Sequence, residues 1–196
     1  MVSQYGHVLS EMQRLRETTL PLTVCIDVVA ASGGYLASLP ATKIVAAPFA
    51  VVGSVGVVAF VPNIRELLSQ FRIRPRTFIA GKYKRTVTLT DDASPEEVAR
   101  FQGQLESIHR QFRNLVVEYR PQAKMEEVET GDHWTAKESI ELNLGLVDEL
   151  STSADYLLRA NRDRDIIEFS QKRGFFEDGI GQYLVHLGHR LTEATF

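Results

Sequence analysis

Residues 24–37 read Val-Cys-Ile-Asp-Val-Val-Ala-Ala-Ser-Gly-Gly-Tyr-Leu-Ala, and this stretch decides the fold class. Its first seven residues, 24–30, are apolar or β-branched except for Asp27, which predicts one buried strand. The small residues that follow, up to Ser32-Gly33-Gly34, predict a tight turn from this strand into a helix. A buried strand that passes directly into a helix is typical of α/β proteins.

Strands and helices alternate along the rest of the chain. Two capping boxes, Ser94 to Glu97 and Thr135 to Glu138, mark helix starts. The first of these helices runs down to Pro121, and Gly145 ends the second. Predicted helices also cover 5–17 and begin at Pro62, and predicted strands cover 24–30, 43–47, 54–60, 73–79 and 146–150. This order predicts an α/β fold with mostly parallel strands.

The composition is that of a globular protein of one domain with a tail. The 196 residues are 44% hydrophobic and 24% charged, with a net charge of −3, which disfavours nucleic-acid binding through bulk charge. The single cysteine, Cys25, allows no intramolecular disulfide, and its place within a strand predicts an inert core thiol. No run approaches 18 uncharged apolar residues, and no signal-peptide pattern opens the chain, so neither feature is expected.

The five histidines are predicted to be surface or boundary residues. His109 flanks the apolar stripe of the long helix, and His133 lies in a turn before a helix. Since no set of side chains has metal-ligand spacing, no metal site is expected.

Ser32 is the first candidate for chemistry, because a junction between a strand and a helix exposes its hydroxyl. The alternative is a plain tight turn that needs serine and glycine for packing. A serine nucleophile needs a base, and a lysine can serve if it is desolvated. Lys84, in the loop from Gly81 to Thr86, is by spacing alone only one of several basic residues, and its alternative is an exposed loop lysine. The basic run 72–85 is a solvated face or a strip for phosphate or lipid headgroups.

Several blocks occur in one order: Ala30-Ala31-Ser32-Gly33-Gly34-Tyr35, then Ala47-Pro48-Phe49, Gly53-Ser54-Val55-Gly56-Val57, and Gly81-Lys82-Tyr83-Lys84-Arg85-Thr86. Together with the later blocks 131–134 and 145–149, they resemble the signal peptide peptidase A (protease IV) family of serine peptidases, and most closely its SohB-like branch. The resemblance runs from about Tyr5 to Tyr156.

The resemblance implies a ClpP/crotonase-like spiral of ββα units and a Ser–Lys dyad without cofactor or metal. Ser32 matches the nucleophile, Lys84 the general base, Ser54 the serine that orients the lysine, and Gly33 an oxyanion N–H donor. The implied substrates are signal peptides or other hydrophobic or unfolded peptides. The implied assembly is a ring-like homo-oligomer with sites at subunit interfaces, and the implied location is the periplasmic side of the bacterial inner membrane.

The sequence departs from the family at its start. Members carry a membrane anchor, a strand and a Ser-Pro-Gly-Gly loop, and no Pro-Gly-Gly occurs here. We therefore expect an amino-terminally truncated peptidase domain, 1–165, and a carboxy-terminal amphipathic extension, 166–196. The apolar stripe of that extension packs on protein or contacts a membrane surface. Two functional alternatives stay open: a catalytically impaired fragment that serves in assembly or binding, and a crotonase-type acyl-thioester enzyme.

Overall fold

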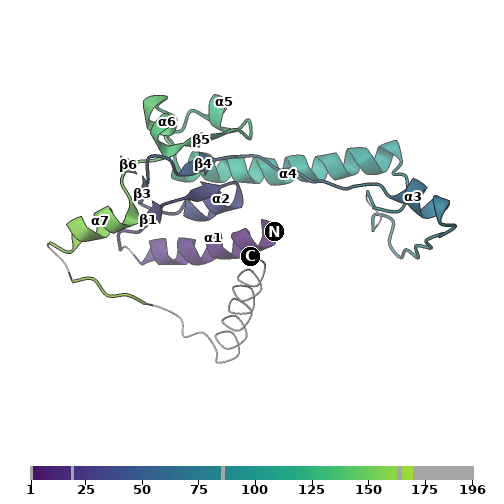
Figure 1. Ribbon diagram of the computed structural model, residues 1–196, viewed down its shortest axis with the longest axis horizontal. Coiled ribbons are helices and arrows are strands. Elements are labelled where there is room, and N and C mark those ends of the chain that lie inside the picture. The colour runs from purple at the N-terminus through teal and green to yellow at the C-terminus, as the bar shows by residue number, and fades with distance from the viewer. Residues whose placement is uncertain (1, 19, 85–86, 163–164, 170–196) are drawn as a thin grey trace, which may run out of the picture. The chain divides into compact units, whose positions relative to one another are not determined.

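The computed structural model describes residues 2–18, 20–84, 87–162 and 165–169 (Figure 1). The chain divides into two units at Leu158–Arg159, and the fold described below belongs to the first. The predicted amphipathic stripe at 175–191 lies outside the described residues.

The helices and strands follow one another in the predicted alternation. In chain order they are α1 (Val2–Glu17), β1 (Thr23–Ile26), β2 (Val29–Ala31), α2 (Gly33–Ser38), β3 (Lys43–Ala46), β4 (Val51–Gly53), α3 (Arg65–Gln70), α4 (Pro95–Tyr119), α5 (Met125–Val128), β5 (His133–Thr135), α6 (Ala136–Glu141), β6 (Glu149–Leu150) and α7 (Ser153–Ala160). Both predicted capping boxes are present, at the starts of α4 and α6.

The strands form two three-stranded sheets, between which the chain passes repeatedly. One has the order β1-β3-β6 and is entirely parallel. The other has the order β2-β4-β5, in which β2 and β4 are parallel and β5 is antiparallel to β4. The chain runs from β1 to β2, through α2, and then from β3 to β4, so a strand of one sheet is followed by a strand of the other. The predicted α/β class with mostly parallel strands is confirmed.

The single strand predicted at 24–30 is wrong, because the chain changes sheets within it. Asp27 and Val28 separate β1 from β2. The Asp27 carboxylate leaves the sheet and accepts hydrogen bonds from the backbone N–H (2.7 Å) and the hydroxyl of Ser153 at the start of α7. These bonds hold the pKa of Asp27 below its ordinary value. A charged residue within an apolar run thus marks the crossing between sheets.

Three further predictions of local structure are wrong. Residues 54–60 follow a strand, β4, rather than forming one, since Ser54 takes a left-handed φ of 55° that ends the ladder. Residues 73–79 form no strand, and all of them are exposed. The helix predicted to end at Gly145 ends at Glu141, because Asn143 already has a positive φ of 53°.

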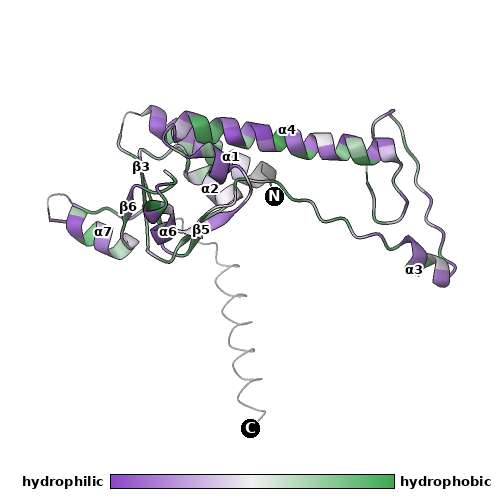
Figure 2. Cartoon of the chain, turned by 90° about the horizontal axis from the view of Figure 1, so that it is seen from above, coloured by the Kyte–Doolittle hydropathy of each residue, from purple (hydrophilic) through white to green (hydrophobic). Residues whose placement is uncertain are grey.

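The core lies around α2 and the two sheets, and α1 packs against α2 (Figure 1). α4 reaches it mainly through Phe112 and Val116 in the second half of the helix. Figure 2 shows α4 as mostly hydrophilic with short hydrophobic stretches. Further fully buried large apolar side chains belong to the strands, to α2 and α5, and to the loops between these elements: Tyr35, Leu39, Ile44, Val45, Val52, Val55, Val128, Leu144 and Leu146.

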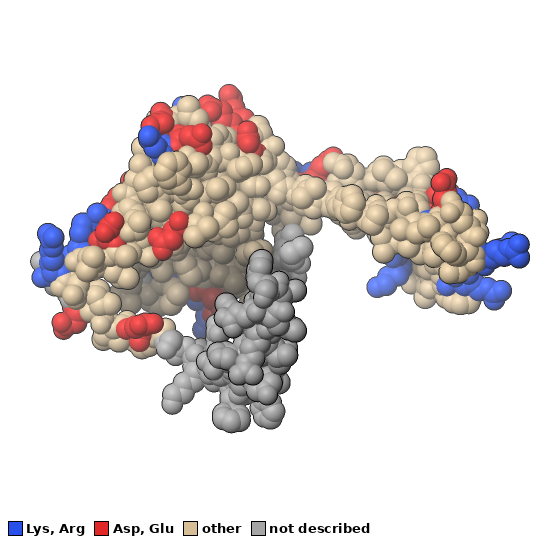
Figure 3. Space-filling view, viewed as in Figure 1, with Lys and Arg blue, Asp and Glu red and all other residues tan. Residues whose placement is uncertain are grey.

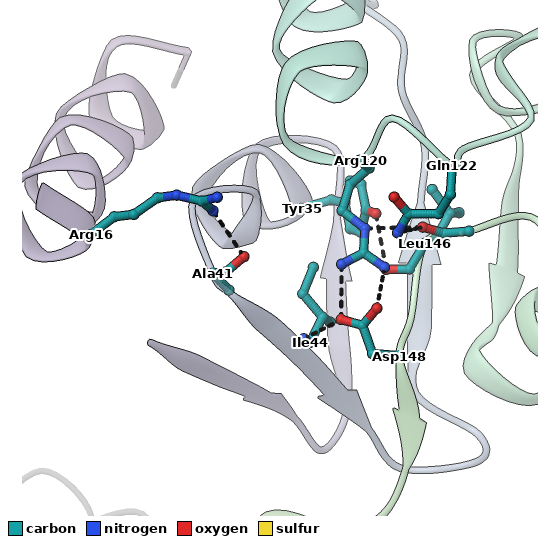
Figure 4. Close-up of polar contacts among 9 residues, drawn as sticks. Arg16, Tyr35, Ala41, Ile44, Arg120, Gln122, Leu146 and Asp148 are labelled. Carbon is teal, nitrogen blue, oxygen red and sulfur yellow. Dashed lines mark hydrogen bonds and ion pairs between the residues drawn. The ribbon is translucent and has the colours of Figure 1, made fainter. Parts of the chain in front are cut away.

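An ion pair between the buried Arg120 and the partly exposed Asp148 joins the end of α4 to the segment before β6 (Figure 4). The Arg120 guanidinium donates to both carboxylate oxygens of Asp148, at 2.8 and 2.7 Å, and to the Gly145 carbonyl at 3.0 Å. The same carboxylate accepts the N–H of Ile44 in β3 at 2.7 Å. Beside it, the buried Tyr35 hydroxyl donates to the Leu146 carbonyl at 3.0 Å, and burial raises the pKa of this phenol. The pair therefore ties α4 to the first sheet.

Gly145 can be tested by substitution, because its backbone admits only glycine. Its φ is 78°, and a Cβ there would lie 2.7 Å from the Gln122 carbonyl oxygen and 2.9 Å from the Ala123 Cα. Both neighbours are backbone atoms, so the clash cannot be relieved by a rotamer change. We expect Gly145→Ala to lower the free energy of unfolding by about 2 kcal/mol in urea titrations.

The matched control for this substitution is Gly103→Ala. Gly103 lies within α4, and a Cβ on it would have nothing within 4 Å. Alanine is the better helix former there, so we expect the free energy of unfolding to rise by about 0.5–1 kcal/mol. Equal effects of the two substitutions would contradict the structure around Gly145.

Candidate active site

Ser32 occupies the junction between β2 and α2 in a strained backbone conformation. Its φ is 49° and its ψ is −118°, which a residue with a Cβ rarely adopts. Two backbone bonds hold it there: its N–H donates to the Gly53 carbonyl at 2.8 Å, and its carbonyl accepts the Leu36 N–H at 2.9 Å. Although Ser32 is the N-cap residue of α2, its hydroxyl makes no capping bond. The side chain is thus exposed on a fixed backbone, as a nucleophile requires.

Ser54 reaches the same place from the end of β4. Gly53 and Ser54 both have positive φ, 94° and 55°, which turns the chain sharply out of the strand. The Ser54 N–H donates to the Asp132 carbonyl at 2.6 Å, and its carbonyl accepts the Gly56 N–H at 2.9 Å. Because β2 and β4 are parallel neighbours, the residues that follow them lie at one edge of the sheet. The structure therefore brings Ser32 and Ser54 together.

Both serines line one pocket of about 470 Å³. One wall is a face of α4, with residues spaced three or four apart. The rest of the pocket lining comes from the turn after β4, from the loop before β5 and from Ser32. The lining residues are Ser32, Ser54, Gly56, Val57, Val58, Gln102, Leu105, Glu106, His109, Thr130 and Gly131. The pocket thus combines an exposed hydroxyl with apolar and polar walls, as a peptide-binding site needs.

His109 and Glu106 are pocket residues that the sequence did not single out for function. A His109 ring nitrogen, Nε2, lies 3.1 Å from the Val55 carbonyl oxygen, so the ring contacts the backbone next to Ser54. Glu106 lies one turn earlier on the same helix face. The spacing of residues 102, 105, 106 and 109 places them on one face of the predicted helix. The sequence did not indicate which part of the fold packs against this face.

Gly33, the predicted oxyanion donor, follows Ser32 directly and begins α2. The ring of Tyr5 in α1 lies against it: a Cβ on Gly33 would be 2.2–2.7 Å from three ring atoms. Position 33 therefore has no space for a side chain unless Tyr5 moves. The role predicted for its N–H stays a prediction.

Lys84 lies apart from the described pocket lining. It is exposed, in the loop that follows Gly81, and its N–H donates to the Gly81 carbonyl at 3.1 Å. The adjacent Tyr83 ring stacks under the Arg100 guanidinium of α4, at 4.0 Å from the ring centre. Figure 3 shows Lys and Arg side chains gathered on the part of the molecule that contains α3. The described residues of the basic run, 72–84, follow α3 in the chain. Within this one chain, the structure does not bring Lys84 and Ser32 into one pocket.

The remaining candidates lie outside this site. Cys25 is half-buried in β1, and burial, followed by the charge of Asp27, raises the pKa of its thiol. His133 lies on a strand, β5, rather than in a turn as predicted. In the part of the chain that the structure describes, no group of three or more His, Cys, Asp or Glu is arranged to hold a metal ion. Nor does any helix there have the length and hydropathy of a membrane span.

Ser32 is thus an exposed serine on a strained turn between a strand and a helix, at the edge of a mixed sheet and beside a pocket. Some hydrolases hold a serine on a comparable turn between a strand and a helix. The family model described as peptidase family S49 matches residues 14–166, and the chain belongs to this family. The predicted resemblance is thereby confirmed.

The curated relatives agree with this family. The chain is 40% identical over 167 residues to the probable protease SohB of Haemophilus influenzae, covering 85% of this chain and 47% of that protein. It is 38% identical over 158 residues to the probable protease SohB of Buchnera aphidicola subsp. Schlechtendalia chinensis (81% and 51%). It is 33% identical over 141 residues to the chloroplastic serine protease SPPA of Arabidopsis thaliana (70% and 20%). The chain spans about half the length of the SohB relatives.

Among solved structures, the chain is similar to an enoyl-CoA hydratase/isomerase from Marinobacter aquaeolei. The TM-score is 0.43 at 12% identity, with 81% of this chain and 42% of that chain covered. The ClpP/crotonase-like α/β class predicted for the chain stands on the family match together with the two sheets, in which three of the four strand pairings are parallel.

Proposed function

We propose that this chain is the catalytic part of a serine endopeptidase that uses a Ser–Lys dyad, with Ser32 as nucleophile and Lys84 as general base. The observation that carries the proposal is the conformation of Ser32. This residue lies on a strained turn in the pocket lining, and its hydroxyl makes no capping bond to α2. Membership of a peptidase family supports the same reaction. The proposed substrates are hydrophobic or unfolded peptides, including signal peptides, at the periplasmic side of the bacterial inner membrane.

The proposed reaction is acyl transfer to Ser32 followed by hydrolysis. The neutral amine of Lys84 takes the Ser32 proton while the Ser32 Oγ attacks the peptide carbonyl, and the Gly33 N–H donates to the resulting oxyanion. The protonated lysine then gives its proton to the leaving amine as the C–N bond breaks. Water, deprotonated by the same amine, releases the acyl group and restores the serine. Ser54 orients the lysine.

The base must come from a second subunit in this proposal. A lysine is neutral near pH 7 only when it is desolvated, and Lys84 is exposed on its own chain. The segment 57–92 that carries it is suited to a subunit contact. Phe60 and Phe78 on this segment are 89% and 91% exposed. The segment also holds seven Lys and Arg against three Asp and Glu, in a chain of net charge −3. Docking on a neighbour would cover the apolar side chains and desolvate Lys84.

Subunit mixing tests this proposal. Ser32→Ala and Lys84→Ala chains are each expected to be inactive on an unfolded protein and on an apolar signal-like peptide. When the two are unfolded and refolded together at equal amounts, some sites pair an intact Ser32 with an intact Lys84 from the neighbour. In a head-to-tail ring, about a quarter of the sites would be restored.

Each outcome of the mixing experiment has a separate meaning. Recovery of about a quarter of the parent activity supports a dyad shared between subunits. An active parent whose variants give no recovery on mixing overturns the shared site. A parent chain that forms oligomers and hydrolyses neither substrate overturns the peptidase proposal for this chain. Lys82→Ala, two residues from Lys84 in the same exposed loop, is the matched control and should stay active.

A further inference from the structure

Glu106 is an acidic residue in the lining of the pocket that contains Ser32. Among the described residues that line this pocket, Glu106 is the only acidic one, and none is Lys or Arg. Glu106 is exposed, and its Oε1 accepts a hydrogen bond from Gln102 Nε2 at 3.3 Å. Among the described residues, the structure shows no ion pair with it. The other titratable residue of the lining, His109, is engaged with the Val55 carbonyl. The described lining of the pocket therefore contains one carboxylate and no cationic side chain of this chain.

The residues around Glu106 define the shape of ligand that would balance this charge. Leu105 precedes it on α4, and Val57 and Val58 line the pocket from the turn after β4. Apolar surface beside a carboxylate suits a side chain with a methylene stem and a cationic end, which packs its stem and extends its charge. Lysine and arginine are the peptide side chains of this kind, whereas an acidic side chain would be repelled.

We propose that Glu106 is a specificity residue that makes the pocket prefer a peptide with a lysine or arginine close to the bond beside Ser32. This inference rests on the proposed function, because it takes the ligand of the pocket to be a peptide. The proposed substrates are defined by their hydrophobicity, and this inference adds that the pocket prefers a positively charged side chain. Glu106 does not take part in the bond-breaking steps.

The test measures binding, so that it does not depend on turnover. The Ser32→Ala chain is titrated with a set of fluorescent peptides of one apolar sequence, in which a single position, moved along the peptide, is lysine, methionine or glutamate. We expect the lysine peptide to bind about fivefold more tightly than its methionine counterpart at low salt, and the glutamate peptide most weakly. The preference should shrink as the ionic strength rises.

Two further chains identify the residue responsible. In Ser32→Ala/Glu106→Gln, which keeps the shape of the side chain, we expect lysine and methionine peptides to bind equally. Glu118→Gln removes an exposed carboxylate from the same helix away from the pocket, and it should leave the preference intact. If Glu106→Gln changes the binding of all peptides by one factor, or leaves the lysine preference in place, the inference is overturned. A uniform change would instead indicate contact with a second subunit.

Hydrolysis by the chains with an intact Ser32 separates this inference from the proposed function. If the peptides bind with the expected preference and none is cleaved, the peptidase proposal fails and the charge preference stands. If lysine and methionine peptides are cleaved with equal kcat/KM, the peptidase proposal stands and the charge preference fails.

Discussion

Replacement of Ser32 by alanine is expected to lower the rate of peptide hydrolysis by about 10⁴-fold or more. The hydroxyl oxygen of Ser32 forms the bond to the substrate in the proposed reaction, and no other described hydroxyl has the same strained position at the start of a helix. Losses of this size are typical when a nucleophile is removed while the binding site is kept. The measurement is kcat/KM for a fluorogenic apolar peptide.

Glycine at the same position should separate activity from stability. Since Ser32 adopts a φ of 49° and a ψ of −118°, which glycine tolerates, Ser32→Gly is expected to be as inactive as Ser32→Ala. Its free energy of unfolding should nevertheless be higher than that of the parent by about 1 kcal/mol. Such opposite effects are characteristic of backbone strain kept for function.

Ser38 provides the matched control on the same helix, α2. Its buried hydroxyl donates to the Tyr35 carbonyl at 2.7 Å, far along the helix from the strained turn. Ser38→Ala should lose about 1 kcal/mol of unfolding free energy and keep its hydrolytic activity. If Ser32→Ala retained activity, or if Ser32→Gly were less stable than the parent, the assignment of Ser32 would be wrong.

The second large effect is expected on stability, from Asp148→Asn. Arg120 is almost fully buried, with 4% of its side chain exposed, and Asp148 holds its guanidinium through two hydrogen bonds. The amide of asparagine is isosteric but carries no charge, so it would leave a buried cation without its counterion. We expect the free energy of unfolding at pH 7 to fall by about 3 kcal/mol, measured by urea denaturation.

The same pair predicts how stability depends on pH. Burial opposes the charged form of Asp148, but the hydrogen bonds from Arg120 and from the Ile44 N–H outweigh it and lower the pKa below its ordinary 3.8. A carboxyl whose folded pKa is lowered stabilises the folded state above its unfolded pKa and loses this contribution as the pH falls through the folded pKa. The difference between parent and Asp148→Asn should therefore be full at pH 5–7 and narrow below about pH 3.8.

Glu11→Gln is the control for this experiment. Glu11 pairs with Arg14 on the surface of α1, where the two side chains are 49% and 74% exposed. An exposed pair contributes little, so the change should stay below about 0.5 kcal/mol at every pH. A loss for Asp148→Asn as small as this, or one that grows in acid, would contradict the role of Asp148 as the counterion of the buried Arg120.

The starts of α4 and α6 were predictable because the signals that make them are local, whereas the helix predicted to begin at Pro62 begins at Arg65. Ser94 and Thr135 each form the predicted capping box with a glutamate three residues later, and Pro95 begins α4. The partners of these bonds lie within one turn of each other, so the spacing along the chain is enough to identify them.

Strand boundaries were less predictable because they depend on partners far away in the sequence. The apolar run 24–30 looks like one strand, but Asp27 pairs with Ser153, and this long-range contact divides the run between two sheets. The apolar run 54–60 has the composition of a strand, but no neighbouring strand among the described residues pairs with it. A strand requires a partner for its backbone groups, and composition does not specify that partner.

The candidate site, too, was predictable only in part from neighbouring residues. Ser32 was predictable, since the small residues around it mark a tight turn after a buried strand. Ser54, Gly33 and Lys84 were assigned through a family resemblance. Of these, the structure brings Ser54 beside Ser32, leaves Lys84 exposed, and leaves their roles as predictions.

By itself, the sequence determined the α/β class, the starts of α4 and α6, the tight turn at Ser32 and the peptidase family, because each rests on neighbouring residues or on blocks in a fixed order. Only the tertiary structure decided that Glu106 and His109 share a pocket with Ser32, that Asp148 pairs with the buried Arg120, and that Asp27 marks a change of sheet. These contacts join residues 28 to 126 positions apart in the chain. They exist because burial of the core brings those segments together, and no pattern of neighbouring residues encodes them.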